Sequence, residues 1–257
     1  MAQSGEKRLE DRVAVITGAG DGIGAGIARR FAAEGARVVV AEIDPANGEA
    51  VAGALHDEFG VDALFVPTDV TVEADNRAAV RAAVERWGTI DILVNNAWGG
   101  DRAGLQRVDR MPDEAMEHAW RINVMGPMWA MKEAFTPMRA AGRGRIINIC
   151  SLNGVNAHMG SVHYNATKEA LRTLTRTAAR EWAGFGITAN VICPGAKTAA
   201  ASEAAIPMGR IGDPVDDIAP VAFFLASDDS VYITGNTLFA DGGSHINGAV
   251  WVPDLGD

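Results

Sequence analysis

A tyrosine and a lysine stand four positions apart, as Tyr164 and Lys168, in the segment SVHYNATKEALRTLTRTAAR. Its apolar residues recur at helical spacing, so both side chains are expected on one helix face. An ammonium group beside a phenol favours the phenolate and lowers the pKa of the phenol. The pair predicts a proton-transfer site with Tyr164 as general acid or base, although such a pair alone is usually a solvated helix face.

Ser151 precedes Tyr164 by thirteen residues and follows the apolar run RIINIC. Open α/β sheets bind their ligands at the carboxyl ends of parallel strands, so a hydroxyl there can hold a substrate oxygen during proton transfer. Asn153 and Met159 are further candidates for the substrate pocket. Leu152, Val155 and Met159 predict an apolar pocket wall, with core packing as the alternative.

A glycine-rich segment lies between the first apolar run and a stretch with helical periodicity. Its candidate cofactor-binding residues are Gly18, Asp21, Gly22, Ile23 and Gly24. Glycine lets the backbone turn tightly and approach a pyrophosphate, which the N–H groups and dipole of the following helix stabilise. A plain strand-to-helix turn also uses glycine, so the flanking strand and helix give this cluster its significance.

Acidic residues follow the second and third apolar runs. Glu42 lies about 20 residues beyond the glycine cluster, where a carboxylate binds the ribose hydroxyls of the adenosine and repels a 2′-phosphate. Together with Asp21, it predicts a preference for NAD over NADP. Asp44 is the alternative ribose ligand, but a helix N-cap before Pro45 suits it better. Asp69 is equally suited to accept from the adenine amino group or to cap a turn.

These residues need a scaffold that brings strand ends together. Short apolar runs begin at Val13, Ala36, Asp62, Ile90, Arg145, Ile187 and Asn236, with amphipathic stretches between them. The alternation predicts an α/β fold, a doubly wound parallel sheet with helices on both faces. No linker or repeat divides residues 1–257, so we expect a single domain, with a nucleotide-binding half at about 11–110 and a catalytic and substrate half at about 111–257.

The composition excludes several classes of protein. A net charge of -10 and a pI near 5.0 disfavour a nucleic-acid partner. The start of the chain has no signal-peptide core and no apolar run is long enough for a membrane, so a soluble, cytoplasmic protein is expected. Cys150 and Cys193 are interpreted as small buried hydrophobes rather than a disulfide. His158 and His163 lack metal-ligand spacing, so no metal is expected.

Taken together, the motifs resemble those of the short-chain dehydrogenase/reductase family over nearly the whole chain. They are TGAGDGIG from Thr17, Asp69–Val70, Asn95–Asn96–Ala97, Asn123 in RINVMG, Ser151, YNATK from Tyr164, Pro194–Gly195 and ADGG from Ala240. The resemblance implies a Rossmann-like fold of seven strands, a bound NAD(P) and usually a homotetramer. It implies that Asn123 holds a water linked to Lys168, and that Lys168 also binds the nicotinamide ribose. It extends the cofactor site to Val70, Asn96, Ala97, Pro194, Gly195 and Thr198.

The chain departs from the family's pattern in three places. Trp98 stands where the family has a glycine after Asn-Asn-Ala, and it is predicted either to wall the substrate pocket or to pack under a loop. Thr198 stands one position earlier after Pro194–Gly195 than the threonine that members of the family use near the nicotinamide carboxamide. The segment between Thr198 and Pro207 is much shorter than the family's substrate-covering loop, so the tail from Ile246 to Val252 is expected to close the site or to pack on a neighbouring subunit.

The sequence therefore predicts an NAD(H)-dependent oxidoreductase that interconverts a secondary alcohol and a ketone. Trp98 and the residues after Ser151 favour a hydrophobic small-molecule substrate that is alicyclic, aromatic or steroid-like. One alternative is a 3-oxoacyl-thioester reductase, which generally uses NADPH. Another is a nucleotide-binding regulator without turnover, although such a protein has no need of Tyr164, Lys168 and Ser151 in register.

Overall fold

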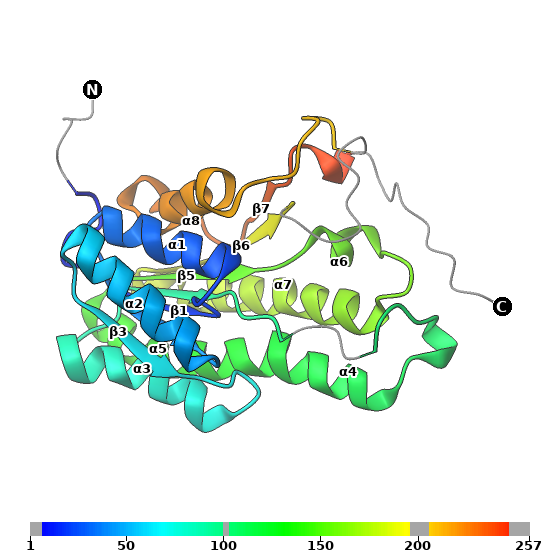
Figure 1. Ribbon diagram of the computed structural model, residues 1–257, viewed down its shortest axis with the longest axis horizontal. Coiled ribbons are helices and arrows are strands. Elements are labelled where there is room, and N and C mark those ends of the chain that lie inside the picture. Colours follow the sequence, from blue (N-terminus) through cyan, green and yellow to red (C-terminus); the bar gives the residue numbers. More distant parts are fainter. Residues whose placement is uncertain (1–6, 100–102, 196–205, 247–257) are drawn as a thin grey trace.

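The computed structural model describes residues 7–99, 103–195 and 206–246, and within them seven parallel strands form one sheet (Figure 1). The strands lie in the order β3-β2-β1-β4-β5-β6-β7. Their bounds are β1 Val13–Thr17, β2 Arg37–Glu42, β3 Ala63–Pro67, β4 Ile92–Asn95, β5 Gly144–Ile149, β6 Ile187–Pro194 and β7 Thr237–Ala240. Each of the seven apolar runs in the sequence became one strand, which confirms the predicted doubly wound sheet.

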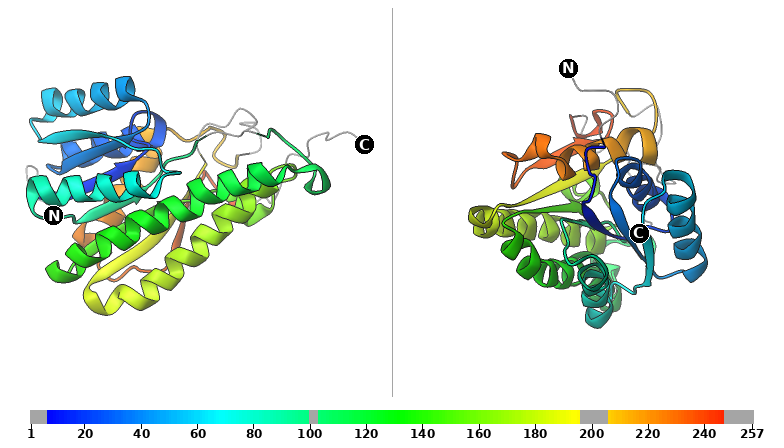
Figure 2. Two further views of the ribbon diagram at one scale, coloured as in Figure 1. Left: turned by 90° about the horizontal axis from the view of Figure 1, so that it is seen from below. Right: turned by 90° about the vertical axis from the view of Figure 1, so that its left-hand side faces the viewer.

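Helices cover both faces of the sheet. The α-helices are α1 Gly22–Ala33, α2 Pro45–Phe59, α3 Glu73–Trp87, α4 Asp113–Trp120, α5 Gly126–Ala141, α6 Leu152–Asn156, α7 Val162–Trp182 and α8 Ala219–Ala226. Helices α1, α2 and α8 lie on one face, and α3, α5 and α7 lie on the other (Figures 1 and 2). The result is a three-layer, Rossmann-like domain.

Strand β1 shows how the sequence builds the two layers. Ala14 and Ile16 belong to the core beneath α1, α2 and α8, whereas Val13 and Val15 belong to the core beneath α3, α5 and α7. All five residues of the strand are buried because successive side chains point to opposite, covered faces. This double burial explains why the strand reads as a continuous apolar run.

Helix ends follow the residues that favour them. Asp44 caps α2, since its carboxylate accepts from the backbone N–H groups of Ala46 at 2.9 Å and Asn47 at 3.3 Å. This confirms the predicted role of Asp44. The same helix ends at Gly60, whose φ of 68° lies in the left-handed region that glycine adopts without strain.

The strand order reverses next to β1. The chain moves outward from β1 through β2 to β3, then returns to β4 on the other side of β1 and continues outward to β7. Loops at the carboxyl ends of β1 and β4 therefore diverge and leave a crevice, which is where sheets of this kind bind ligands. None of the helices within the described ranges is long and apolar enough to cross a membrane.

Candidate active site

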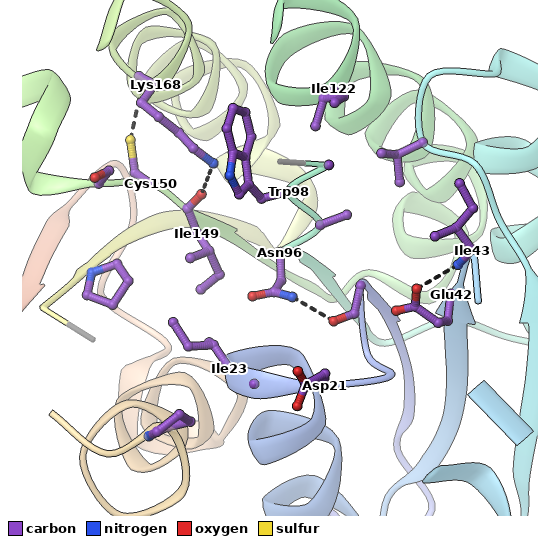
Figure 3. A pocket seen from close by; sticks show the side chains of 18 of the residues that line it. Asp21, Ile23, Glu42, Ile43, Asn96, Trp98, Ile122, Ile149, Cys150 and Lys168 are labelled. Atoms are coloured by element: carbon purple, nitrogen blue, oxygen red, sulfur yellow. Dashed lines mark hydrogen bonds between the residues drawn. The ribbon is translucent and has the colours of Figure 1, made fainter. Parts of the chain in front are cut away.

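A cavity of about 890 Å³ opens at the carboxyl ends of the strands. Figure 3 shows Glu42 and Ile43 at one end of it, and Lys168 and Cys150 at the other. Most of the predicted site residues lie along its wall: Gly18, Asp21, Gly22, Ile23, Glu42, Asp69, Val70, Asn96, Ala97, Trp98, Ser151, Tyr164, Lys168 and Pro194. Its volume is at the upper end of the range for small-molecule and cofactor sites.

The glycine turn between β1 and α1, residues 18–21, lines part of this cavity. Gly18 and Gly22 have φ angles of 62° and 55°, a conformation that side chains disfavour. Gly24 does not line the cavity, but a Cβ there would lie 2.0 Å from the carbonyl oxygen of Gly18. Helix α1 can therefore begin directly against the turn, with its N-terminal N–H groups at the cavity edge.

Asn96 and Ala97, the two residues after β4, contact the glycine turn. The side-chain amide of Asn96 donates to the carbonyl oxygens of Thr17 and Gly18, both at 3.0 Å. A Cβ on Gly18 would lie 2.7 Å from the Cα of Ala97, so the two backbones touch. Asn96 and Ala97 thus hold the shape of the turn as well as lining the cavity.

Glu42 occupies the place where a nucleotide ribose is expected. Its carboxylate accepts from the backbone N–H groups of Gly20 at 3.0 Å and Ile43 at 2.8 Å. A Cβ on Gly20 would lie 2.7 Å from the Cγ of Glu42, so the glycine makes room for the acid. Because each carboxylate oxygen can accept more than one hydrogen bond, Glu42 keeps capacity for hydroxyl donors.

The side chain of Asp69 caps the turn that follows β3. Its carboxylate accepts from the backbone N–H of Thr71 at 2.8 Å and from the hydroxyl of Thr71 at 2.7 Å. The turn-capping alternative is therefore present, while Asp69 also lines the cavity beside Thr68 and Val70. Only the free lone pairs of this carboxylate are left for an adenine amino group.

The end of the cavity lined by Ser151, Tyr164 and Lys168, the predicted catalytic end, gathers side chains from elements far apart in sequence. Ser151 follows β5 and caps α6, where its hydroxyl accepts from the N–H of Asn153 at 3.1 Å. Lys168 on α7 donates from Nζ to the carbonyl oxygen of Ile149 at 2.9 Å, and its Nζ lies 5.5 Å from the centre of the Tyr164 ring. Ser151, Tyr164 and Lys168 therefore meet, as their spacing predicts.

The protonation behaviour of Tyr164 differs from the sequence expectation. Burial raises the pKa of Tyr164 to about 12, because the ionised phenol loses its hydration, and a hydrogen bond with Ser151 offsets only part of this effect. The expectation of a lowered pKa was wrong for this structure. Lys168 is itself buried, which lowers the pKa of its ammonium, and its proton is directed to the Ile149 carbonyl.

Asn123 lies in a π-helical turn, η2 Arg121–Met125, between α4 and α5. Its side-chain amide donates to Thr167 Oγ1 at 3.0 Å, but its buried Oδ1 has no hydrogen-bond partner among the described residues. A small cavity of about 10 Å³ lies against both Asn123 and Lys168. That volume is close to the minimum that one water molecule needs, and the amide oxygen and ammonium supply polar partners for it.

Trp98 lies against Tyr164. The indole and phenol rings are 4.6 Å apart between centroids and inclined at 66°, an edge-to-face arrangement. Trp98 lines the cavity and is 39% exposed. Of the two predicted alternatives, the position at the pocket wall is the one that the structure adopts.

Other predicted residues have different surroundings. Asn153 and Met159 are not among the described residues that line the cavity, and Met159 is half exposed. Gly195 packs closely on Asp241, since a Cβ there would lie 2.5 Å from the Asp241 Cα. Thr198, the segment to residue 205 and the tail beyond Ile246 lie outside the described residues.

Sequence reasoning missed several residues of the cavity wall. Ile43 is 65% exposed beside Glu42, and an apolar residue directly after a strand was the available signal. Ile211, Gly212, Asp213 and Pro214 close the cavity from the segment before α8. The contact of this segment with α1 depends on tertiary packing: a Cβ on Gly26 of α1 would lie 3.0 Å from the Pro214 carbonyl oxygen.

No cluster of three metal-ligating side chains occurs in ranges 7–99, 103–195 and 206–246. Cys150 and Cys193 are buried, unbridged thiols at the ends of β5 and β6. The thiol of Cys150 donates to the backbone carbonyl of Lys168 at 2.9 Å. Both side chains are buried, in line with their interpretation as small buried hydrophobes, and Cys150 also contributes to the cavity wall.

Comparisons with known proteins agree with this geometry. Residues 18–245 match a family model described as enoyl-(acyl carrier protein) reductase. The chain is 39% identical to a trans-4-hydroxycyclohexanecarboxylate dehydrogenase of Sinomonas cyclohexanicum, over 92% of this chain and 93% of that protein.

Solved structures of dehydrogenases also resemble this chain. A short-chain type dehydrogenase/reductase from Mycobacterium ulcerans superposes with a TM-score of 0.86 at 29% identity, covering 92% of this chain and 90% of the other. An NAD⁺-bound xylitol dehydrogenase superposes with the same TM-score and identity, covering 92% and 100%. The chain belongs to the short-chain dehydrogenase/reductase family of oxidoreductases.

Proposed function

We propose that the protein is an NAD(H)-dependent dehydrogenase or carbonyl reductase that interconverts a secondary alcohol and a ketone. The main support is one continuous cavity with Glu42 at one end and Tyr164, Ser151 and Lys168 at the other. That arrangement suits a dinucleotide bound along the cavity with its reactive ring beside the phenol. The relatives named as dehydrogenases agree with this reaction class.

The nucleotide end fits NAD better than NADP. The charged residues among those described on its wall, Asp21, Glu42 and Asp69, are acidic. They repel a 2′-phosphate, whereas the carboxylate of Glu42 can accept from ribose hydroxyls. The left-handed glycines and the start of α1 provide the close backbone approach that a pyrophosphate needs.

A bound NAD⁺ would supply the hydride acceptor for the alcohol carbon. Ser151 would hold the substrate oxygen, and Tyr164 would take up the alcohol proton as the phenolate or, in the reverse direction, give its phenol proton to the ketone oxygen. Lys168 supplies positive charge near the phenol and would be the residue that holds the nicotinamide ribose. Asn123, through its unpartnered Oδ1, would hold a water beside Lys168 in the small cavity that both residues line.

The substrate side of the cavity favours an apolar ring. Trp98, Ile122 and Ile149 contribute to the described wall near Tyr164. An alicyclic or aromatic secondary alcohol can pack on these side chains while its hydroxyl reaches Ser151. The similarity to a trans-4-hydroxycyclohexanecarboxylate dehydrogenase supports an alicyclic ring. We also propose a homotetramer, as the family resemblance implies, which light scattering tests, and a cytoplasmic location, which the two unbridged cysteines support.

A panel assay tests the function. Formation of reduced nicotinamide is followed with alicyclic, aromatic and acyclic secondary alcohols, with NAD and NADP in parallel, for the wild type and Tyr164→Phe. Loss of the general acid or base should lower kcat by about 10²- to 10⁴-fold while NAD still binds. Turnover with NAD that Tyr164→Phe lacks would support the proposal.

Two other outcomes identify the alternatives. Turnover with NADPH and a 3-oxoacyl thioester, and none with the alcohols, would favour an acyl-thioester reductase, a candidate that the description of the matched family model keeps open. Tight binding of NAD without turnover on either panel, and with no effect of Tyr164→Phe, would favour a nucleotide-binding regulator.

A further inference from the structure

Trp98 touches the one side chain on which the proposed proton transfer depends. It comes from the loop after β4, while Tyr164 comes from α7, and their rings meet edge to face at 4.6 Å. The indole faces the cavity and is partly exposed, and Tyr164 is part-buried on the same wall, where desolvation raises the pKa of its phenol. A glycine in place of Trp98 would leave this side of the phenol without a covering side chain.

The backbone on both sides of Trp98 is held in place. The N–H groups of Asn96 and Ala97 both donate to the Thr17 hydroxyl, at 3.0 and 3.2 Å. After the tryptophan, Gly99 lies so close to Ile122 that a Cβ would be 2.7 Å from its Cδ1. The indole is therefore anchored against the phenol by contacts to β1 and to the η2 turn.

We propose that Trp98 is a positioning residue for Tyr164, whose indole fixes the phenol ring and keeps water from it, thereby setting how strongly the hydroxyl holds its proton. The catalytic consequence rests on the proposed function, but the effect on Tyr164 does not. Water near an ionised phenol stabilises the charge, so removing the indole should make Tyr164 more acidic.

Other groups also act on the phenol, and the test must leave them in place. The titratable side chains around it are Lys168 on the same helix, Cys150 and Cys193 at the ends of β5 and β6, and His118 of α4 on the cavity wall. Ser151 adds a hydrogen bond that favours ionisation. None of these groups is altered by a substitution at Trp98.

The chain contains only two tyrosines, which makes a direct measurement possible. Tyr232 is fully exposed, so Tyr232→Phe removes a surface phenol and leaves Tyr164 as the only tyrosine. In that background, ¹³C-labelled tyrosine gives one ring signal whose chemical shift reports the ionisation of Tyr164 without any need for turnover. The same spectra show whether the protein is still folded at each pH.

Three substitutions remove progressively more of the side chain that covers the phenol of Tyr164: Trp98→Phe, Trp98→Leu and Trp98→Ala. The apparent pKa of Tyr164 should fall in that order, with a drop of about one unit or more for Trp98→Ala, equivalent to a tenfold rise in the ionised fraction below both values. Trp120→Ala, which removes a partly exposed tryptophan of α4 outside the cavity, should leave the titration unchanged.

Kinetics provide a second readout. For alcohol oxidation, the pH dependence of kcat/KM should move to lower pH in Trp98→Ala and stay close to wild type in Trp98→Phe, with kcat reduced more than the affinity for NAD. An unchanged Tyr164 titration in Trp98→Ala, or an equal shift in Trp120→Ala, would overturn the inference. If Trp98→Ala does not fold, a pKa that is equal in Trp98→Phe and Trp98→Leu overturns it. A shifted titration without any turnover would keep the inference and reject the proposed function.

Discussion

The two ends of the cavity are built in different ways. At the nucleotide end, Glu42 and Asp69 bind backbone N–H groups within or next to their own loops, and the side chains stay partly exposed. At the proposed catalytic end, Asn123, Tyr164 and Lys168 come from a π-helical turn and a long helix, and desolvation raises the pKa of Tyr164 and lowers that of Lys168.

This difference decides what each end can tolerate. The nucleotide end depends on how closely backbone segments approach one another, so its shape is sensitive to single added atoms. The catalytic end depends on desolvation, so its chemistry is sensitive to which side chains keep water away. Substitutions at the first end should alter binding and stability, and substitutions at the second should alter pH dependence and kcat.

The largest effect is expected from Gly24→Ala, which tests whether close backbone approach determines the shape of the nucleotide end. The new Cβ would lie 2.0 Å from the Gly18 carbonyl oxygen and 2.5 Å from the Asn96 amide nitrogen, so α1 must move away from the turn. We expect a loss of about 2–3 kcal/mol in the free energy of unfolding, together with weaker NAD binding. Chemical denaturation and calorimetric titration with NAD measure the two effects.

Gly53→Ala is the matched control for that substitution. Gly53 lies inside α2, is exposed, and has no atom within 4 Å of its virtual Cβ. Alanine should stabilise the helix there by about 0.5–1 kcal/mol and leave NAD binding unchanged. If Gly24→Ala were as well tolerated as Gly53→Ala, close backbone approach would not be what shapes the nucleotide end.

The sequence predicted the nucleotide end better than the catalytic end, for a physical reason. A strand such as β1, a cap such as Asp44 and a left-handed glycine such as Gly60 are determined by neighbouring residues and by alternation, which are visible in one dimension. The meeting of Ser151 with Tyr164 and Lys168 also followed from spacing, once a parallel sheet was assumed.

What the sequence did not predict depends on burial. The spacing of Tyr164 and Lys168 indicated a lowered pKa for the phenol, but the packed structure removes water from both groups and directs the lysine to the Ile149 carbonyl. Likewise, nothing local indicates that Ile211 and Gly212 would reach the cavity, or that Trp98 would contact Tyr164. Such features require the positions of elements distant in sequence.

A smaller effect is expected from Glu42→Gln, which keeps the shape of the side chain but removes its charge. The amide oxygen can still accept from Gly20 or Ile43, so the loop should persist, whereas repulsion of a 2′-phosphate is lost. The ratio of kcat/KM with NAD to that with NADP should fall by roughly tenfold, as for the loss of about one charged hydrogen bond. Asp69→Asn is the control and should alter this ratio less. A ratio unaffected by Glu42→Gln would remove Glu42 from the selection of the cofactor.

The smallest effect is expected from Asp44→Ala. This variant tests whether Asp44 only caps α2 while Glu42, two positions earlier, binds the nucleotide. Asp44 satisfies the N–H groups of Ala46 and Asn47 at the start of α2, whereas Glu42 lines the cavity. Loss of the cap should cost about 1 kcal/mol and lower Tm by about 2–4 °C, and Asp44→Asn, which can still cap, should restore most of it. The NAD to NADP ratio should stay at the wild-type value in both variants, because the ribose carboxylate is untouched. A change in that ratio with intact stability would mean that Asp44, rather than Glu42, reaches the nucleotide, and the local distinction between cap and ligand would have to be reversed.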